Sequence, residues 1–542
     1  MIYLILDAVR SEHMDTNSPV YNELNKAWKV TCKVLFGEEI GELKEYEDYL
    51  LEYTGNPNIK SSIISGKPVS LAFENYCKTA RFISLDEIEF TKRFEPLNIN
   101  EIKDLDSIIE ALNERFVYAG NIILGNSKFI EHSSNITNSF YIYKSFIVDN
   151  SKYAAYSKLL RYSQYSFGSN GAFQNFVIRC CLTADSQRCF ESFYTVNSTD
   201  IFYSANIESC SNCLFSFNIK GKRNAIGNLE IPKDKYIDLK KKLIKEIIDE
   251  FKSKKHPLSL LDLLSTLPPA YLDFEKHEEI FDIKPVEEAF KNTFRIVLKK
   301  IPEGNLEDYK NFLLKNLPEF LNLKDTASKQ DVLTFDFYIG GKERILKAKH
   351  RVIDWKDSLV LMENPPTLAI DEIEKISLND PSLLSKIAFI SLTFIGGKNK
   401  NVGKPVIASR DSFDCYYGDY AVSKECAFSV WPRQSSNIFG GKFIFDSNFC
   451  INSHNSTNLM RAFEVDGCTN CSDLYFSHNC ENVNDSMFCF NVKNLNHAIG
   501  NATLSQDQYI KVKESLIGQM ADEIIKTKQL RYDIFNIGCG KK

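Results

Sequence analysis

The stretch SNCLFSFNIKGKRNAIGN at residues 211–228 returns as NDSMFCFNVKNLNHAIGN at residues 484–501, at an offset of 273 residues. The match extends beyond these stretches without gaps. Eighteen of the 49 positions in 188–236 are identical in 461–509. A segment that repeats at a fixed offset is typical of chains built from copies of one unit. We therefore expect a tandem duplication, in which two copies of one module make up the chain.

Each module is expected to have three parts. A mixed, helix-rich part comes first, followed by short aromatic and β-branched runs broken by Asn, Ser, Asp and Cys. An amphipathic helix closes the module, because apolar residues there recur at helical spacing. The expected boundaries are a mixed part at 1–112, a β-solenoid at 113–230 and a capping helix with linker at 231–273 in module 1, then 274–385, 386–503 and 504–542 in module 2.

The middle part of each module contains a shorter sequence repeat. NSTDIFYSAN (197–206) precedes SCSNCLFSFN (209–218), and NCSDLYFSHN (470–479) precedes NVNDSMFCFN (482–491), each at a spacing of 12. Short strands stacked at a small period favour a parallel β-solenoid. Asn suits its corners, because Asn tolerates a left-handed backbone. The expected fold class is therefore α+β, with two parallel β-solenoids and two capping helices.

Composition limits the class of protein. The 542 residues are 44% hydrophobic and carry a net charge of −5, which argues against a general nucleic-acid-binding surface. No stretch approaches 18 apolar residues, so we expect no membrane partner. The segment MIYLILDAVR has no basic residues before its apolar run and no cleavage site. We therefore expect a cytoplasmic protein whose 15 cysteines are mostly reduced.

The closing segment of the repeat resembles a known group of proteins. The pattern C-x-x-C-L-F-S-F-N-I-K-G-K-R-N-A-I-G-N, followed by DKYIDLKKKL, is similar to the end of uncharacterised cysteine-rich β-solenoid repeat proteins from archaeal and candidate-phylum bacterial genomes. The resemblance covers about 190–245 and 465–520, and this chain has far fewer cysteines. It implies a solenoid fold and supplies no catalytic residues.

Four side chains of module 2 form a candidate zinc site: Cys468, Cys471, His478 and Cys480. Thiolates and imidazoles are the usual ligands of tetrahedral zinc. The repeat favours another interpretation, since small or apolar residues occupy the equivalent positions of module 1 and thiols in such places behave as small core residues. We therefore expect no cofactor, with zinc as the alternative. The equivalent residues are Thr195, Ser198, Ala205 and Ile207.

Charged residues kept in both modules are the candidates for catalysis. Some solenoid enzymes act on polysaccharides with carboxylates and basic groups on one sheet, which perform general acid–base catalysis. Asp in turns and Glu in solvent are also common without any such role. The candidates are Arg188, Glu191 and Asp200 in module 1 and Arg461, Glu464 and Asp473 in module 2.

The sequence favours a structural function. A repeated surface can bind copies of itself and build a larger assembly. The chain also lacks a recognisable catalytic constellation shared by both modules. The leading hypothesis is therefore a non-catalytic cytoplasmic scaffold that self-assembles. A carbohydrate-active solenoid enzyme and a zinc-dependent interaction module are the two alternatives.

Overall fold

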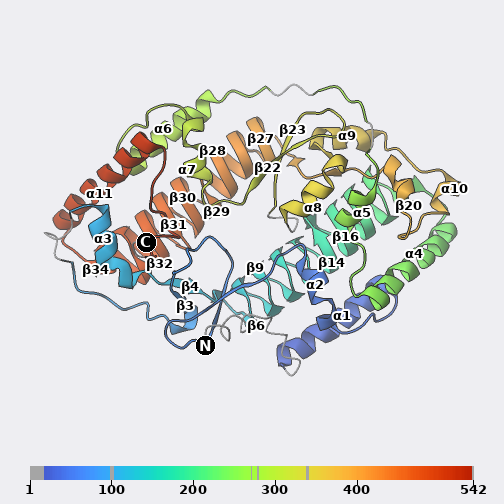
Figure 1. Cartoon of the computed structure of the whole chain (residues 1–542), viewed down its shortest axis with the longest axis horizontal. Helices are drawn as coiled ribbons and strands as arrows, with labels where there is room; N and C mark the ends of the chain where they lie inside the picture. The colour runs from blue at the N-terminus through green and yellow to red at the C-terminus, as the bar shows by residue number, and fades with distance from the viewer. Residues whose placement is uncertain (1–17, 98–102, 270–271, 277–279, 337–340, 540–542) are drawn as a thin grey trace, which may run out of the picture.

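The computed structural model describes residues 18–97, 103–269, 272–276, 280–336 and 341–539 (Figure 1). Helices surround two large parallel sheets, one of 17 strands and one of nine. The expected combination of helices with parallel sheets is confirmed. We call the sheets the first stack and the second stack, and define them by their strands in the next two paragraphs.

The first stack spans residues 123–230, and its final strand alone is antiparallel to its neighbour. Its strands are β5 (Ile123–Leu124), β6 (Lys128–Glu131), β7 (Ser134–Thr137), β8 (Phe140–Tyr143), β9 (Phe146–Asp149), β10 (Lys152–Ala155), β11 (Lys158–Arg161), β12 (Gln164–Phe167), β13 (Gly171–Ala172), β14 (Asn175–Cys181), β15 (Thr183–Ala184), β16 (Gln187–Val196), β17 (Thr199–Glu208), β18 (Ser211–Leu214), β19 (Phe217–Lys220), β20 (Arg223–Ile226) and β21 (Leu229–Glu230).

The second stack spans residues 394–503 and also ends in an antiparallel strand. Its strands are β26 (Phe394–Ile395), β27 (Lys400–Ser409), β28 (Phe413–Phe439), β29 (Lys442–Phe445), β30 (Asn448–Thr457), β31 (Met460–Asp466), β32 (Ser472–Met487), β33 (Phe490–Ile499) and β34 (Ala502–Thr503). Among the described residues, four small sheets lie outside the stacks: β1 (Asn58–Ser61) with β2 (Pro68–Leu71), β3 (Phe82–Ser84) with β4 (Tyr118–Gly120), β22 (Phe320–Lys324) with β23 (Asp331–Phe335), and β24 (Val352–Ile353) with β25 (Ile390–Ser391).

Most paired residues within a stack lie twelve positions apart in the chain, and a few pairs lie 11 or 13 apart, such as Leu160 with Gly171 and Lys400 with Phe413. Phe190 pairs with Phe202 in the first stack, and Cys450 pairs with Ala462 in the second. Every third residue from Val422 to Gly500 has a positive φ, so the chain turns a corner after each short straight segment. Asn and Gly meet this demand at low cost, whereas a β-branched residue such as Val422 is strained there.

Serine side chains link one turn of a stack to the next. The hydroxyl of Ser133 accepts a hydrogen bond from the backbone N–H of Ser145, and Ser145 accepts one from Ser157, both at 3.0 Å. Cysteines fill the same role elsewhere, since Cys468 Sγ accepts the N–H of Cys480 at 3.3 Å. Ser and Cys therefore exchange because either supplies a small acceptor for a buried N–H.

Helices pack along the outer sides of both stacks (Figure 1). α1 lies against β8, β10 and β12, and α6 lies against β28 and β30. The helices expected after each solenoid are present as α4 and α11. The helices are α1 (Pro19–Phe36), α2 (Glu47–Leu51), α3 (Leu105–Leu112), α4 (Lys233–Lys254), α5 (Leu260–Thr266), α6 (Lys284–Leu298), α7 (Lys310–Leu314), α8 (Lys342–Lys347), α9 (Trp355–Glu363), α10 (Ile370–Ile373) and α11 (Gln506–Thr527). Among these described helices, none combines the length and the apolar character that crossing a bilayer requires.

The two halves of the chain cover each other's stacks. β4, from the first half, packs against β32 and β33, and Asn491 Nδ2 donates to the carbonyl of Val117 at 2.7 Å. In return, α9 packs against β19, and Asn218 Nδ2 donates to the carbonyl of Phe389 at 2.9 Å. A disulfide also joins Cys77 to Cys539, while thirteen other cysteines are free and buried. The halves are therefore held together by reciprocal contacts.

Candidate functional site

The charged residues singled out by the repeat all lie at corners of the stacks, where φ is positive. Arg188 Nη2 lies 2.8 Å from Asp200 Oδ2, on the next turn of the first stack. Arg461 forms the equivalent pair with Asp473, with Nε donating to Oδ1 at 2.8 Å. A lysine from the following helix approaches each aspartate at 3.9 Å, Lys240 in the first half and Lys513 in the second. An arginine, an aspartate and a lysine therefore tie each stack to its helix.

Glu191 is fully buried and connects four segments of the first half. Its carboxylate accepts hydrogen bonds from the hydroxyls of Tyr49 at 2.6 Å and Tyr53 at 2.8 Å. It also accepts Arg179 Nε and the backbone N–H of Leu260, both at 2.9 Å. With an exposed fraction of 0%, Glu191 does not reach solvent or a polymeric substrate.

Glu464 has a related position in the second half. It accepts hydrogen bonds from Asn452 Nδ2 and from the backbone N–H of Ile534, both at 2.9 Å. Burial, and then the charge of Asp533, raises the pKa of Glu464 to about 8. The structure therefore does not bring Glu191 or Glu464 together with the aspartates at an open surface.

The four candidate zinc ligands point in two directions. The sulfurs of Cys468, Cys471 and Cys480 belong to the apolar interior of the second stack. His478 instead faces outward, where Nδ1 lies 2.8 Å from Asp466 Oδ2 and Nε2 accepts the N–H of Ala119 at 2.9 Å. Both ring nitrogens are thus occupied by the protein. Within the described ranges of the chain, no group of three or more His, Cys, Asp and Glu side chains has the arrangement of a metal site.

Replacing Cys471 by Ser, the residue found at the equivalent position 198, should change the free energy of unfolding by less than about 1.5 kcal/mol, because Ser nearly conserves the volume and keeps an acceptor for the backbone N–H of Val483. Burial raises the pKa of the Cys471 thiol, which opposes the thiolate form that zinc needs. We expect urea unfolding to be nearly unchanged and the purified wild-type protein to hold substoichiometric zinc. One zinc per chain that the substitution removes, measured by elemental mass spectrometry, would contradict this.

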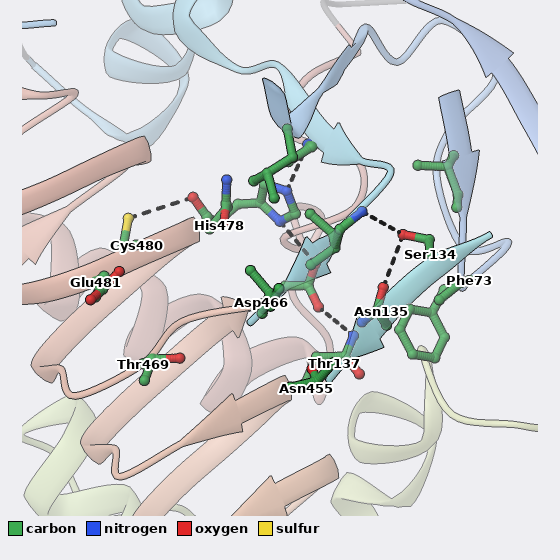
Figure 2. Close-up of a pocket in the computed structure, with 18 of the residues that line it drawn as sticks. Phe73, Ser134, Asn135, Thr137, Asn455, Asp466, Thr469, His478, Cys480 and Glu481 are labelled. Carbon is green, nitrogen blue, oxygen red and sulfur yellow. Dashed lines mark hydrogen bonds and ion pairs between the residues drawn. The ribbon is translucent and has the colours of Figure 1, made fainter. Parts of the chain in front are cut away.

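A cavity of about 290 Å³ lies where the first half meets the second stack. Figure 2 shows the side chains that line it, with Phe73, Ser134 and Asn135 on one side and Asp466 and His478 on the other. Asp466 is held by His478 and by Asn455, whose Nδ2 donates to Oδ1 at 3.0 Å. The cavity is therefore polar on its second-stack side.

Asp466 and His478 belong to a column of buried ionisable residues. Lys442 pairs in register with His454, His454 with Asp466, and Asp466 with His478. The exposed fractions of these four residues are 3%, 0%, 2% and 4%. We call them the charged column. Four ionisable groups on consecutive turns, all removed from solvent, mark this face of the second stack as unusual, because buried ionisable groups cluster at functional sites.

Burial controls the protonation states along the charged column. It lowers the pKa of Lys442 to about 7 and that of His454 to about 3, with the neighbouring Lys442 charge adding to the effect on His454. For Asp466, burial alone would raise the pKa, but the hydrogen bond and charge of His478 outweigh it and lower the pKa. Within the described residues, neither ring nitrogen of His454 has a hydrogen-bond partner.

Sequence reasoning found only His478 of this column. The comparison of the two halves concealed the others, because Ser169, Cys181 and Phe193 stand opposite Lys442, His454 and Asp466. The signal was nevertheless present as Lys, His, Asp and His at successive spacings of 12. A search for ionisable residues that recur every 12 positions would have found this column, whereas a search for residues identical in the two halves does not.

Comparison of the chain with protein-family models, with curated proteins and with solved structures gives no match.

Proposed function

We propose that the protein is a non-catalytic structural protein, built from two homologous β-solenoid modules, that assembles with copies of itself. In this proposal each stack is one solenoid of twelve-residue turns, and α4 and α11 are the capping helices. The modules arose by duplication of a common unit. The charged residues kept in both halves serve the framework of each module rather than a reaction.

Equivalent contacts at equivalent positions carry the proposal. The ion pair of Arg188 with Asp200 recurs 273 residues later as Arg461 with Asp473. The contact from the following helix recurs too, as described for Lys240 and Lys513. Residues retained for catalysis would be expected to converge on a cleft open to substrate. Here they instead bond turn to turn and stack to helix, as framework residues do.

Two further pairs of contacts support homology of the modules. Asn218 and Asn491, 273 residues apart, each donate to a backbone carbonyl of the other half. Glu191 and Glu464, at the same offset, each accept a backbone N–H from the segment after the capping helix. These contacts are long-range, so neither pair follows from local sequence similarity alone.

Exposed aromatic rings on the first stack support self-association. Tyr162 and Phe173 are each 53% exposed, and their rings stack at a centroid distance of 5.0 Å on adjacent turns. A ladder of rings from successive turns is exposed at Phe129 and partly buried at its other members, Tyr141, Tyr153, Tyr165 and Phe176. Exposed apolar patches often mark protein interfaces. The exposed rings of Tyr162, Phe173 and Phe129 suit contact with a second copy of the chain.

The mass in solution tests the proposal. We expect light scattering after size-exclusion chromatography to give a multiple of the 62.1 kDa chain mass at micromolar concentration. Combined replacement of Tyr162 and Phe173 by Ser should return the protein to a single chain. Replacement of Ile301, 64% exposed and far along the chain, by Ser is the matched control and should leave the mass unchanged. A wild-type protein that is monomeric under these conditions would overturn self-assembly.

A further inference from the structure

The cavity of about 290 Å³ between the first half and the second stack has room for one small molecule. Three corners of the second stack border it, Asn455, Gly467 and Asn479, at spacings of 12. Other corner asparagines of this stack bond to one another from turn to turn, and Asn458 Nδ2 donates to Asn470 Oδ1 at 3.1 Å. At Gly467 such a ladder lacks one side chain. This wall of the cavity therefore has a gap where an Asn side chain would otherwise stand.

Packing does not require a glycine at position 467. Apart from its chain neighbours, only the backbone N and Cα of Asn479 among the described residues would come within 4 Å of a Cβ there, at 3.8 and 3.9 Å. The φ of 66° suits Asn as well as Gly. Asn455 Nδ2 donates to Asp466 instead, and within the described chain Asn479 Oδ1 receives no hydrogen bond. The gap thus leaves a hydrogen-bond acceptor unused without relieving a clash.

Asp466 contributes a buried acceptor beside this gap. Its side chain is 3% exposed, and its two oxygens accept one hydrogen bond each, from Asn455 and His478. A carboxylate has about four acceptor positions, so about two remain for a ligand. Two neighbouring acceptors of this kind match two adjacent hydroxyl groups.

Unused hydrogen-bonding groups from both stacks line the same cavity (Figure 2). Thr137 of the first stack and Thr469 of the second border it, and no described residue bonds to either hydroxyl. Asn135 Oδ1 accepts the hydroxyl of Ser134, and its Nδ2 has no acceptor in the described ranges. Asn135, Thr137 and Thr469 are partly exposed, so a ligand can enter beside them. The lining therefore offers both donors and acceptors, as a hydroxyl-rich ligand requires.

The charges around the cavity favour a neutral ligand. Lys493 Nζ lies 2.5 Å from Glu481 Oε2 and 4.7 Å from the ring centroid of Phe90. Lys442 Nζ lies 4.1 Å from the ring centroid of Phe73. An organic cation would meet these ammonium groups at the very rings that could bind it. An anion would meet the buried carboxylate described above.

The first half supplies an apolar wall to the cavity, with Phe73, Tyr76 and Ala119. A sugar ring has the same two-sided character, since its C–H face is apolar and its hydroxyl groups donate and accept hydrogen bonds. We propose that the cavity binds one neutral sugar ring or cyclic polyol, with hydroxyl groups bonded to Asp466 and filling the gap at Gly467. The C–H face of the ligand lies against Phe73. This binding site is independent of the self-assembly proposed above.

Saturation-transfer difference NMR on the full-length protein tests the class of ligand. The probes are D-glucose, D-galactose, D-mannose and myo-inositol, with choline as an organic cation for comparison. We expect at least one of the four polyols to bind with a dissociation constant of about 1 mM or lower. Failure of all four to bind would overturn the proposal, and so would binding of choline alone.

Replacement of Gly467 by Asn tests the location of the site. Asn completes the ladder and occupies neighbouring corners, so we expect the fold to persist and the dissociation constant of the bound polyol to rise at least about tenfold. Gly221→Asn is the matched control, because Gly221 has a φ of 68° and no described atom within 4 Å of a Cβ, and it does not line the cavity. That variant should bind as the wild type does. Unchanged affinity in the folded Gly467 variant would contradict the site.

A second variant keeps the test decisive if the Gly467 variant does not fold. Replacement of Thr469 by Val removes a hydroxyl to which no described residue bonds. We expect the midpoint of urea unfolding to stay unchanged and the affinity for the polyol to fall at least about threefold. Equal affinity of this variant and the wild type would then refute binding at this cavity.

Discussion

Replacing Glu191 by Ala should lower the free energy of unfolding by about 3–5 kcal/mol, the largest loss we expect from a single substitution in this chain. The substitution removes the acceptor for two tyrosine hydroxyls and one backbone N–H. It also leaves the guanidinium of Arg179, itself 0% exposed, with Glu52 as its remaining carboxylate partner. A buried charge that loses a partner pays the cost of its lost hydration without full compensation. Urea unfolding followed by circular dichroism measures the change.

The matched control is Glu208, another carboxylate kept in both halves. Its side chain is 37% exposed and pairs with Lys220, which is also exposed. Such surface pairs contribute at most about 1 kcal/mol, so replacement of Glu208 by Ala should have a small effect. Equal losses in the free energy of unfolding for the two variants would show that the buried hydrogen bonds of Glu191 do not stabilise the first half.

We expect the effect of replacing Glu464 by Gln to depend on pH. The free energy of unfolding of the variant, relative to that of the wild type, should be higher at pH 8 than at pH 5. The pKa of Glu464 is about 8 in the folded protein against a usual value of 4.5. The folded state therefore keeps a proton that the unfolded state releases above pH 4.5. Stability linked to this group is complete below pH 4.5 and is lost as the pH rises through 8. The amide of Gln has nearly the shape of a neutral carboxyl group and does not ionise.

We expect the difference between variant and wild type to shift by about 2 kcal/mol or more in favour of Gln between pH 5 and pH 8, measured by urea unfolding at both values. Replacement of Glu481 by Gln serves as the control, because that side chain is 44% exposed and pairs with Lys493. A pH-independent difference for the Glu464 variant would refute the buried, protonated carboxyl.

Features that depend on local chemistry followed from the sequence. Asn218 and Asn491 were expected at turns and have φ values of 53° and 55°. The amphipathic helix expected within 231–273 is α4, and it buries Leu243, Ile247 and Phe251 at helical spacing. These outcomes follow because backbone preference and helical periodicity act over a few residues.

The reciprocal covering of the stacks did not follow from the sequence. No local sequence pattern predicts the hydrogen bond from Asn491 to the carbonyl of Val117, because it joins residues far apart in the chain and depends on the final geometry of both halves. The charged column was missed for a related reason. Its members acquire their unusual states only when Phe73, Ala119 and the neighbouring turns remove them from water. Burial of that kind is a property of the assembled fold.

The reciprocal covering also dictates an order of events during synthesis. The first stack is complete when the ribosome reaches residue 230, yet α9 and Phe389, which cover its far end, emerge later. The strand that covers the second stack, β4, emerges early and must wait for β32 and β33. A truncated nascent chain would therefore present uncovered strands, a state prone to aggregation. The first half cannot close before α9 and Phe389 have been made, so a premature stop ahead of α9 should leave the first stack uncovered as well as remove the second.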